Sequence, residues 1–207
     1  MLTFEIQHQQ EYSRGELLLR TFFGWLYICI PHLFVIYFLA LFLAILRLVS
    51  FFIILFTGET PEWYFNLTVQ LNRWVLRVFA RVFNLSDGYP AFGLDAKDDK
   101  TAFALEKWQI GRGDMVLRTF FGSLYVGIPH GVILCFRYIA SWFLGFLAFF
   151  AVLFTGKYPE DWHKFNVGTF RWGTRVSLYL AWLYKEYPPF SGRPDPGPQK
   201  FEFENKQ

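Results

Sequence analysis

Two histidines are conspicuous because each follows a proline within a long apolar stretch. Pro31-His32 and Pro129-His130 both end the tripeptide IPH. A proline inside a helix removes a backbone hydrogen bond and bends the helix. A histidine at membrane depth is rare and suggests a functional site. The pair could relay protons or ligate a haem from both sides. The structural interpretation is that an imidazole N–H satisfies the carbonyl freed by the proline.

Arginines form a second candidate site on two amphipathic segments, Tyr64–Leu85 and Lys164–Leu183. Apolar residues recur there at three- and four-residue spacing, which predicts helices. With arginines four apart facing outward and a tryptophan at the boundary, each helix should lie in the headgroup layer. Guanidinium groups suit phosphate oxygens. The lipid- or phosphate-binding candidates are Arg73, Arg77, Arg171, Arg175, Trp74 and Trp172. Two alternatives stay open: simple anchoring of the protein, and ion pairing with Glu62, Glu160 or a partner.

These motifs recur because the chain is a tandem duplication. RGELLLRTFFGWLYICIPH (Arg14 to His32) returns as RGDMVLRTFFGSLYVGIPH (Arg112 to His130). At the same offset LFTG, the Arg-Trp pair and YPAF return as LFTG, Arg-Trp and YPPF. The predicted organisation is a first repeat at 1–93, a linker at 94–111, a second repeat at 112–191 and a polar tail at 192–207.

Composition indicates a membrane protein. The 207 residues are 54% hydrophobic, 22% aromatic and only 18% charged, whereas a soluble domain carries about a quarter charged residues. Two cysteines cannot form a disulfide scaffold, and a net charge of +3 gives no nucleic-acid signature. The N-terminal residues resemble no signal peptide. We therefore expect a bacterial inner membrane location and no nucleic-acid partner.

The apolar stretch Thr21–Thr57 has 37 residues, too long for one crossing of a hydrocarbon core about 30 Å thick. Either each repeat forms a hairpin of two crossings, or a surface helix leads into one crossing at Pro31. In the hairpin arrangement every Lys and Arg except Arg47 and Arg137 falls on one side, which fits the positive-inside rule. We therefore predict an all-α fold of four transmembrane helices. The predicted crossings are Leu17–Leu39, Leu41–Phe56, Val116–Phe136 and Ile139–Phe154.

This topology places both termini in the cytoplasm and relates the repeats by a pseudo-two-fold axis along the membrane normal. His32 and His130 would then lie across the axis, and Arg47 and Arg137 would snorkel at the hairpin tips. Outside the membrane, LTFEIQ near the N-terminus and KFEFEN in the tail alternate like short strands that could pair.

Enzymatic signatures such as glycine-rich phosphate loops, G-x-S-x-G and H-E-x-x-H are missing from the sequence. We expect no enzyme activity, no metal and no cofactor. The expected function is that of a structural or accessory subunit of a membrane assembly. Its expected partners are membrane lipids with anionic headgroups, and other membrane subunits or a second copy. The alternative is a small transporter or lipid-handling protein that uses the paired His and Arg residues.

The combined motif resembles a known family. IPH, LFTGKYP, FNVGTFRWGTRV and YPPF together are similar to the bacterial membrane family of domains of unknown function numbered 4389. In the first repeat Thr60 replaces the tyrosine, Gln70 the glycine and Ala91 the second proline of this pattern. The resemblance covers most of the chain in two copies and implies an integral membrane protein, with no activity attached.

Overall fold

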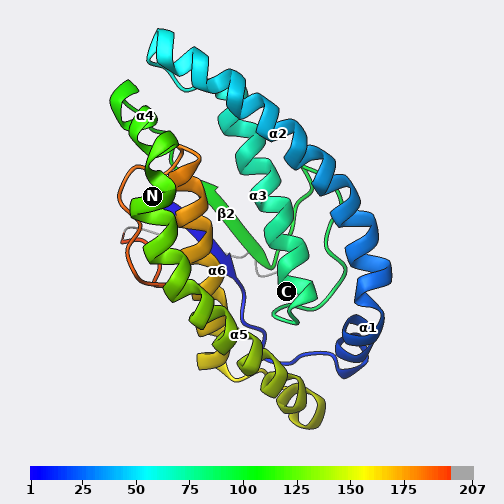
Figure 1. Cartoon of the computed structure of the whole chain (residues 1–207). Coiled ribbons are helices and arrows are strands. Elements are labelled where there is room, and N and C mark those ends of the chain that lie inside the picture. Colours follow the sequence, from blue (N-terminus) through cyan, green and yellow to red (C-terminus); the bar gives the residue numbers. More distant parts are fainter. Residues whose placement is uncertain (197–207) are drawn as a thin grey trace.

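The computed structural model describes residues 1–196, and most of these residues are helical (Figure 1). Each repeat contains a long apolar segment, interrupted by a π-helical turn, followed by an amphipathic helix. The elements of the first repeat are β1 (Leu2–Ile6), α1 (Arg14–Gly24), η1 (Trp25–Cys29), α2 (Ile30–Thr57) and α3 (Glu62–Val82). The linker contains β2 (Thr101–Leu105), and the elements of the second repeat are α4 (Arg112–Phe120), η2 (Ser123–Gly127), α5 (Ile128–Thr155) and α6 (Glu160–Leu180).

The predicted helical hairpins are wrong. α2 and α5 are continuous helices of 28 residues each and pass straight through the positions of the expected turns. The chain bends at η1 and η2, just before Pro31 and Pro129, and reverses only after Thr57 and Thr155. Neither expected turn region contains a glycine or proline to break the helix. Within residues 1–196, two helices rather than four are long and apolar enough to cross a membrane.

The two repeats exchange contacts at the ends of their long helices. Gly58 and Gly156 end α2 and α5 in the left-handed conformation, with φ of 81° and 74°, which favours glycine. The Arg112 side chain donates to the Phe56 carbonyl at 3.0 Å, and Arg14 donates to the Phe154 carbonyl at 3.2 Å. Each repeat therefore begins where the long helix of the other repeat ends, and α2 and α5 run in opposite directions (Figure 1).

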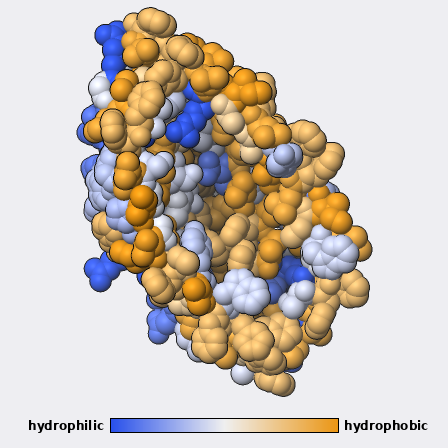
Figure 2. Space-filling model, viewed as in Figure 1, coloured by the Kyte–Doolittle hydropathy of each residue, from blue (hydrophilic) through white to orange (hydrophobic). Residues whose placement is uncertain are grey.

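The outer faces of the long helices expose large apolar side chains. On α2 these follow helical spacing at Phe34, Leu41, Leu48 and Phe56, and Phe56 is 76% exposed. Figure 2 shows hydrophobic residues over most of this face, whereas hydrophilic ones gather at one edge and within a central hollow. We call the exposed faces of α1, α2, α4 and α5 the apolar layer.

Charged residues within the two long apolar segments turn away from the apolar layer. Arg47 donates to the Leu180 carbonyl at 2.6 Å and lies over the Trp182 ring. Arg137 lies over the ring of Phe165, with 4.2 Å between its guanidinium carbon and the ring centroid. The prediction that Arg47 and Arg137 snorkel at hairpin tips is therefore wrong, because both guanidinium groups lie against carbonyls and aromatic rings of the protein.

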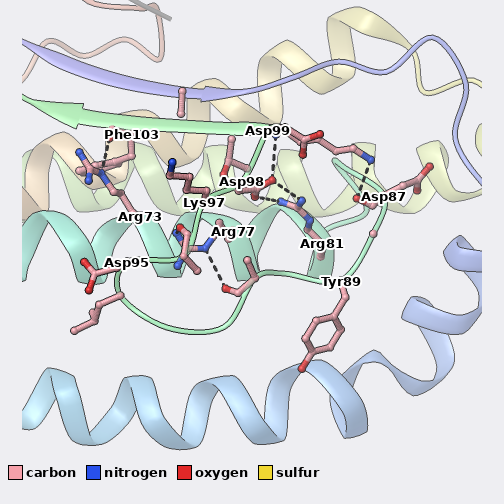
Figure 3. A pocket seen from close by; sticks show the side chains of 17 residues that line it. Arg73, Arg77, Arg81, Asp87, Tyr89, Asp95, Lys97, Asp98, Asp99 and Phe103 are labelled. Carbon is pink, nitrogen blue, oxygen red and sulfur yellow. Dashed lines mark hydrogen bonds and ion pairs between the residues drawn. The ribbon is translucent and has the colours of Figure 1, made fainter. Parts of the chain in front are cut away.

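The molecule is layered, with α3 and α6 in the middle. α3 packs on α2 and β2, and α6 packs on α5 and β1. Figure 3 shows the layers from the side in the first repeat, with α2, then α3, then the strands. The amphipathic periodicity predicted α3 and α6 correctly as helices. Their placement in the headgroup layer is wrong, because both are enclosed between other elements of the protein.

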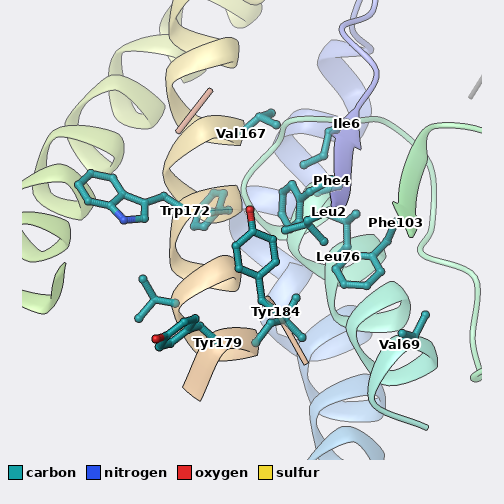
Figure 4. Packing of buried hydrophobic residues seen from close by; sticks show 14 of the residues in the cluster. Leu2, Phe4, Ile6, Val69, Leu76, Phe103, Val167, Trp172, Tyr179 and Tyr184 are labelled. Atoms are coloured by element: carbon teal, nitrogen blue, oxygen red, sulfur yellow. The ribbon is translucent and has the colours of Figure 1, made fainter. Parts of the chain in front are cut away.

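The strands join the two repeats. β1 and β2 are antiparallel, and Phe4 lies opposite Phe103 at the middle of the register. The predicted strand near the N-terminus is confirmed, and it pairs with β2 of the linker. The KFEFEN segment lies outside the described residues. Figure 4 shows β1 side chains packed between α3 and α6, with Leu2, Phe4 and Leu76 among the buried core.

Candidate functional site

His32 and His130 occupy equivalent buried positions. The Trp74 indole N–H donates to Nδ1 of His32 at 2.8 Å, and Trp172 donates to Nδ1 of His130 at the same distance. Both imidazoles are 0% exposed. Because Nδ1 accepts in each case, the imidazole is neutral and carries its proton on Nε2. Each bond fixes the first turn of a long helix to the middle of the amphipathic helix that follows it.

Aromatic residues of the same repeat surround each histidine. His32 lies against Tyr89 and Phe92, with ring centroids 5.3 and 4.9 Å away. The equivalent Tyr187 and Phe190 lie against His130, and Phe190 stacks on the imidazole at 3.9 Å. Among the described residues, all ring neighbours of each histidine come from its own repeat. The two imidazoles thus form no shared pair, which a proton relay or bis-histidine haem would require.

Tyrosine, rather than histidine, satisfies the carbonyl that each proline frees. Pro31 cannot donate to the carbonyl of Tyr27, four residues earlier, and the Tyr89 hydroxyl donates to that carbonyl at 3.3 Å. In the second repeat Tyr187 donates to the Tyr125 carbonyl at 3.1 Å. The prediction that an imidazole N–H fills this role is wrong. The tyrosine of YP-x-F and the proline of IPH are therefore partners.

Arg77 and Arg175 hold the segments that follow YP-x-F. Arg77 is 3% exposed and donates to the carbonyls of Ala91, Gly93 and Ala96. Arg175 is completely buried and donates to the carbonyls of Ser191 and Arg193, and its Nε lies 2.7 Å from a carboxylate oxygen of Asp195. Each guanidinium group therefore donates hydrogen bonds to several backbone carbonyls, in place of water.

Arg73 and Arg171 join the amphipathic helices to the sheet. Nε of Arg73 donates to the Phe103 carbonyl at 3.0 Å, and Nε of Arg171 donates to the Phe4 carbonyl at 2.9 Å. Arg171 also pairs with Glu5 at 2.8 Å. Since Phe4 and Phe103 face each other in the register, these contacts are a symmetric pair.

The arginine candidates therefore do not face a lipid headgroup layer as predicted. Arg77, Arg171 and Arg175 are buried, and Trp74 and Trp172 are each 2% exposed and bonded to histidine. Only Arg73 is exposed, on the sheet side of α3. The stripe of arginines four residues apart is real, but it points towards the strands and the segment after YP-x-F.

A cavity of about 960 Å³ opens between α3, β2 and residues 87–101. Figure 3 shows Arg73, Lys97 and Asp99 among its lining side chains. Arg81 forms a bidentate pair with Asp98, at 2.6 and 2.9 Å. Burial raises the pKa of Asp98, but the bonds from Arg81 outweigh burial and hold that pKa below its usual range. Both lysine and aspartate residues of the segment 95–100 line the cavity, so its surface carries positive and negative charges together.

A family model described as Domain of unknown function (DUF4389) matches residues 16–93 and 117–192. The chain belongs to this family. It carries the DUF4389 domain in two tandem copies, as its motifs indicate. Neither the curated proteins nor the solved structures include a match to the chain.

One departure between the two DUF4389 copies has a structural cause. In the second copy Gly168 lies directly against the Gly192 carbonyl, and a Cβ on Gly168 would approach that oxygen to 2.9 Å. In the first copy Gln70 takes this position and donates to Asp95 at 2.7 Å. The glycine allows the chain to pass close to the helix, whereas the glutamine reaches a chain that passes farther away.

Sequence reasoning missed several residues that hold these arrangements. Asp87 accepts from Arg20 at 2.7 Å and from the Ser13 backbone, which fixes the start of α1. Its signal was its position directly after the amphipathic helix, in a turn before YP-x-F. His163 donates to the Leu85 carbonyl of the other repeat at 3.1 Å, although its sequence context indicated no role.

Proposed function

We propose that this DUF4389 protein is a non-enzymatic structural or accessory component of a membrane assembly in the bacterial inner membrane. The observation that carries the proposal is the apolar layer, which the protein itself leaves uncovered. Leu18, Phe22 and Trp25 extend that layer onto α1 and η1. Leu117 and Phe120 extend it onto α4, and Phe121 onto the C-cap of that helix. Monomeric soluble proteins rarely expose contiguous apolar patches of more than a few hundred Å².

The polar motif residues support this proposal because the hydrogen bonds that they make hold the fold together. The histidines accept from tryptophans, and the arginines donate to backbone carbonyls. A catalytic or transport site needs polar groups that can bind a substrate. Among the described residues, no cluster of His, Cys, Asp and Glu could hold a metal ion. The apolar layer is therefore the feature that we assign to contact with the membrane.

Cationic residues at the edges of the layer are suited to anionic lipid headgroups. Arg14 and Arg112 begin α1 and α4, are exposed, and lie at the ends of the long helices. Lys157 is exposed just beyond α5. Each basic residue near an anionic surface contributes about 1 kcal/mol. With these residues at the cytoplasmic leaflet, both termini and the linker face the cytoplasm.

A lipid-handling function has one observation in its favour. An open groove of about 940 Å³ runs along α5 and is lined by apolar residues, including Leu134, Tyr138, Trp142 and Phe146. Neither paired histidine lines this groove. A function based on lipid handling would therefore use the groove, and replacing both His32 and His130 by leucine would leave the binding site in place.

Purification in mild detergent followed by native mass spectrometry tests the assembly proposal. We expect the wild type to retain a second copy or a defined membrane subunit together with bound phospholipid. The variant Phe38→Glu changes an exposed residue of the apolar layer and should lose the bound phospholipid. The matched control Asp99→Ala changes an exposed residue beside β2 and should keep it. A lone monomer without lipid would contradict the proposal.

A further inference from the structure

We propose that the apolar layer lies flat within one leaflet of the bilayer, so that α2 and α5 run along the membrane plane. The lipid acyl chains of that leaflet cover the layer, while the strands and charged segments remain in water. This inference rests on the proposed membrane function and adds its geometry. Its observations are the direction of the long helices, the layering and the distribution of charge.

The pseudo-two-fold relation between the repeats restricts the possible orientations. The register of β1 and β2 is centred where Phe4 faces Phe103, so the axis passes through the sheet. The same axis relates α2 to α5, which run in opposite directions (Figure 1). If both helices crossed the bilayer, the axis would have to lie in the bilayer midplane. The two-stranded sheet would then lie at the membrane centre.

A sheet at that depth carries a large energetic cost. Asp95, Lys97 and Asp99 are exposed next to β2 and line the charged cavity. Each charged side chain at the bilayer centre costs about 2.5–3.5 kcal/mol even on the lowest scales. The outer edges of a two-stranded sheet add unpaired backbone groups, which hydrocarbon cannot satisfy. An axis along the membrane normal avoids both costs, because the sheet and the long helices lie at opposite ends of it.

The length of the apolar surface agrees with the flat orientation. On α2 alone, exposed apolar positions begin at Ile30 and continue to Phe56. A helix rises about 1.5 Å per residue, so this surface is about 40 Å long and exceeds a hydrocarbon core of about 30 Å. A single layer of helices about 10 Å thick fits within one leaflet. The flat orientation therefore covers the whole layer, whereas a crossing would cover only part of it.

Two hydroxyl groups and one terminal carbonyl of α2 are bonded within the protein, as lipid contact requires. Ser50 donates to the Leu46 carbonyl at 2.8 Å, and Thr57 donates to the Ile53 carbonyl at 2.7 Å. The carbonyl of Phe56 accepts from Arg112. A partner protein could provide such bonds itself, but acyl chains cannot. The internal satisfaction of these groups therefore favours lipid as the occupant.

Spin-label depth measurements in phospholipid vesicles test the inference on the full-length chain. Cys29 and Cys135 are the only cysteines and are first replaced by alanine. Single cysteines are then placed at Phe34, Leu41 and Phe56, all exposed on one face of α2, and labelled. Collision rates with oxygen and with a water-soluble nickel chelate give the depth of each label. A cysteine at Asp99 is the matched control beside the strands.

The flat orientation predicts similar depths for the three α2 labels, within about one helical turn of 5.4 Å, and a water-exposed label at position 99. A crossing predicts that the labels at 34 and 56 lie near opposite interfaces while the label at 41 lies deep. That profile would overturn the flat orientation but leave the proposed membrane function standing. Labels exposed to water at all three α2 positions would overturn both.

A second measurement needs no substitution and keeps the test decisive if a labelled variant misfolds. Polarised infrared dichroism of the wild type in aligned bilayers reports the mean direction of the helix axes. The flat orientation predicts amide I dichroism of helices perpendicular to the membrane normal. Dichroism of helices parallel to the normal would overturn the inference.

Discussion

Each Trp–His hydrogen bond should stabilise the fold, and a double-mutant cycle can measure this coupling. The bond from Trp74 to His32 is 2.8 Å long and fully enclosed. His32→Leu leaves the buried indole N–H without an acceptor, and Trp74→Phe leaves the imidazole without its donor. An unsatisfied buried polar group costs about 1–3 kcal/mol. Replacing both partners removes both unsatisfied groups, so the double variant should lose less than the sum of the single losses.

The expected coupling is about 1–2 kcal/mol, in the range measured for residues in direct contact. Thermal unfolding in detergent, followed by circular dichroism, is a suitable assay, since 1 kcal/mol shifts Tm by about 2–4 °C for a domain of this size. The equivalent cycle on His130 and Trp172 is an internal replicate, because its bond has the same length. Strictly additive single effects in both repeats would refute a structural role for the histidines.

Three further predictions concern stability. Arg175→Leu should lower the free energy of unfolding by about 3–5 kcal/mol, because it leaves Asp195 buried without its cationic partner. Arg73→Leu, at an exposed position, should lower it by about 1 kcal/mol. Chemical denaturation compares the two variants, and equal losses would contradict the contrast in burial. Burial lowers the pKa of His163 from 6.5 to about 4, so only the unfolded chain takes up this proton between those values. Stability should fall by about 3 kcal/mol as the pH drops from 6.5 to 4, and His163→Phe should remove that part of a pH titration; an unchanged slope would exclude His163 as its source. Gly168→Ala should lower Tm, because the added Cβ clashes with the Gly192 carbonyl. The control Gly131→Ala in α5 adds a Cβ that meets nothing within 4 Å, so it should keep or raise Tm. Equal Tm values for the two variants would show that the chain around Gly192 moves away without cost.

The sequence predicted the parts of the fold that depend on local pattern. The duplication, the family, the helices α3 and α6 and the strand at residues 2–6 follow from repeats, amphipathic period and alternation. The bend before Pro31 also follows, because proline removes a specific hydrogen bond. Each of these features is predicted either from a pattern of a few neighbouring residues or from motifs that recur along the chain.

The direction of the arginine stripe could not be predicted from α3 and α6 alone. A basic stripe beside an apolar face is compatible with either lipid headgroups or an enclosing loop. The direction of the stripe is determined by residues 91–96 and 191–195, because their carbonyl and carboxylate groups bind Arg77 and Arg175. Those segments have no periodic pattern, so their path over the helix appears only in three dimensions.

The hairpin prediction failed for a related reason. Assigning cations to one side assumed that arginines near apolar stretches remain accessible, whereas Arg20, Arg77 and Arg118 are buried. The positive-inside rule applies to cations in loops that flank the membrane, and these arginines lie in helices that bond other parts of the chain. Because the sequence does not show which arginines are buried, counting the Lys and Arg residues on each side of the membrane favoured the hairpins. The continuous helices α2 and α5 contradict that topology.

Salt and alkaline washing of bacterial membranes that carry the native chain tests the central claim, that the apolar layer contacts lipid. We expect the protein to stay in the membrane pellet through both washes and to be released only by detergent. Phe38→Glu should weaken this retention, and Asp99→Ala should not. Complete release of the wild type by salt alone would show that the layer is not embedded in lipid and would contradict the account.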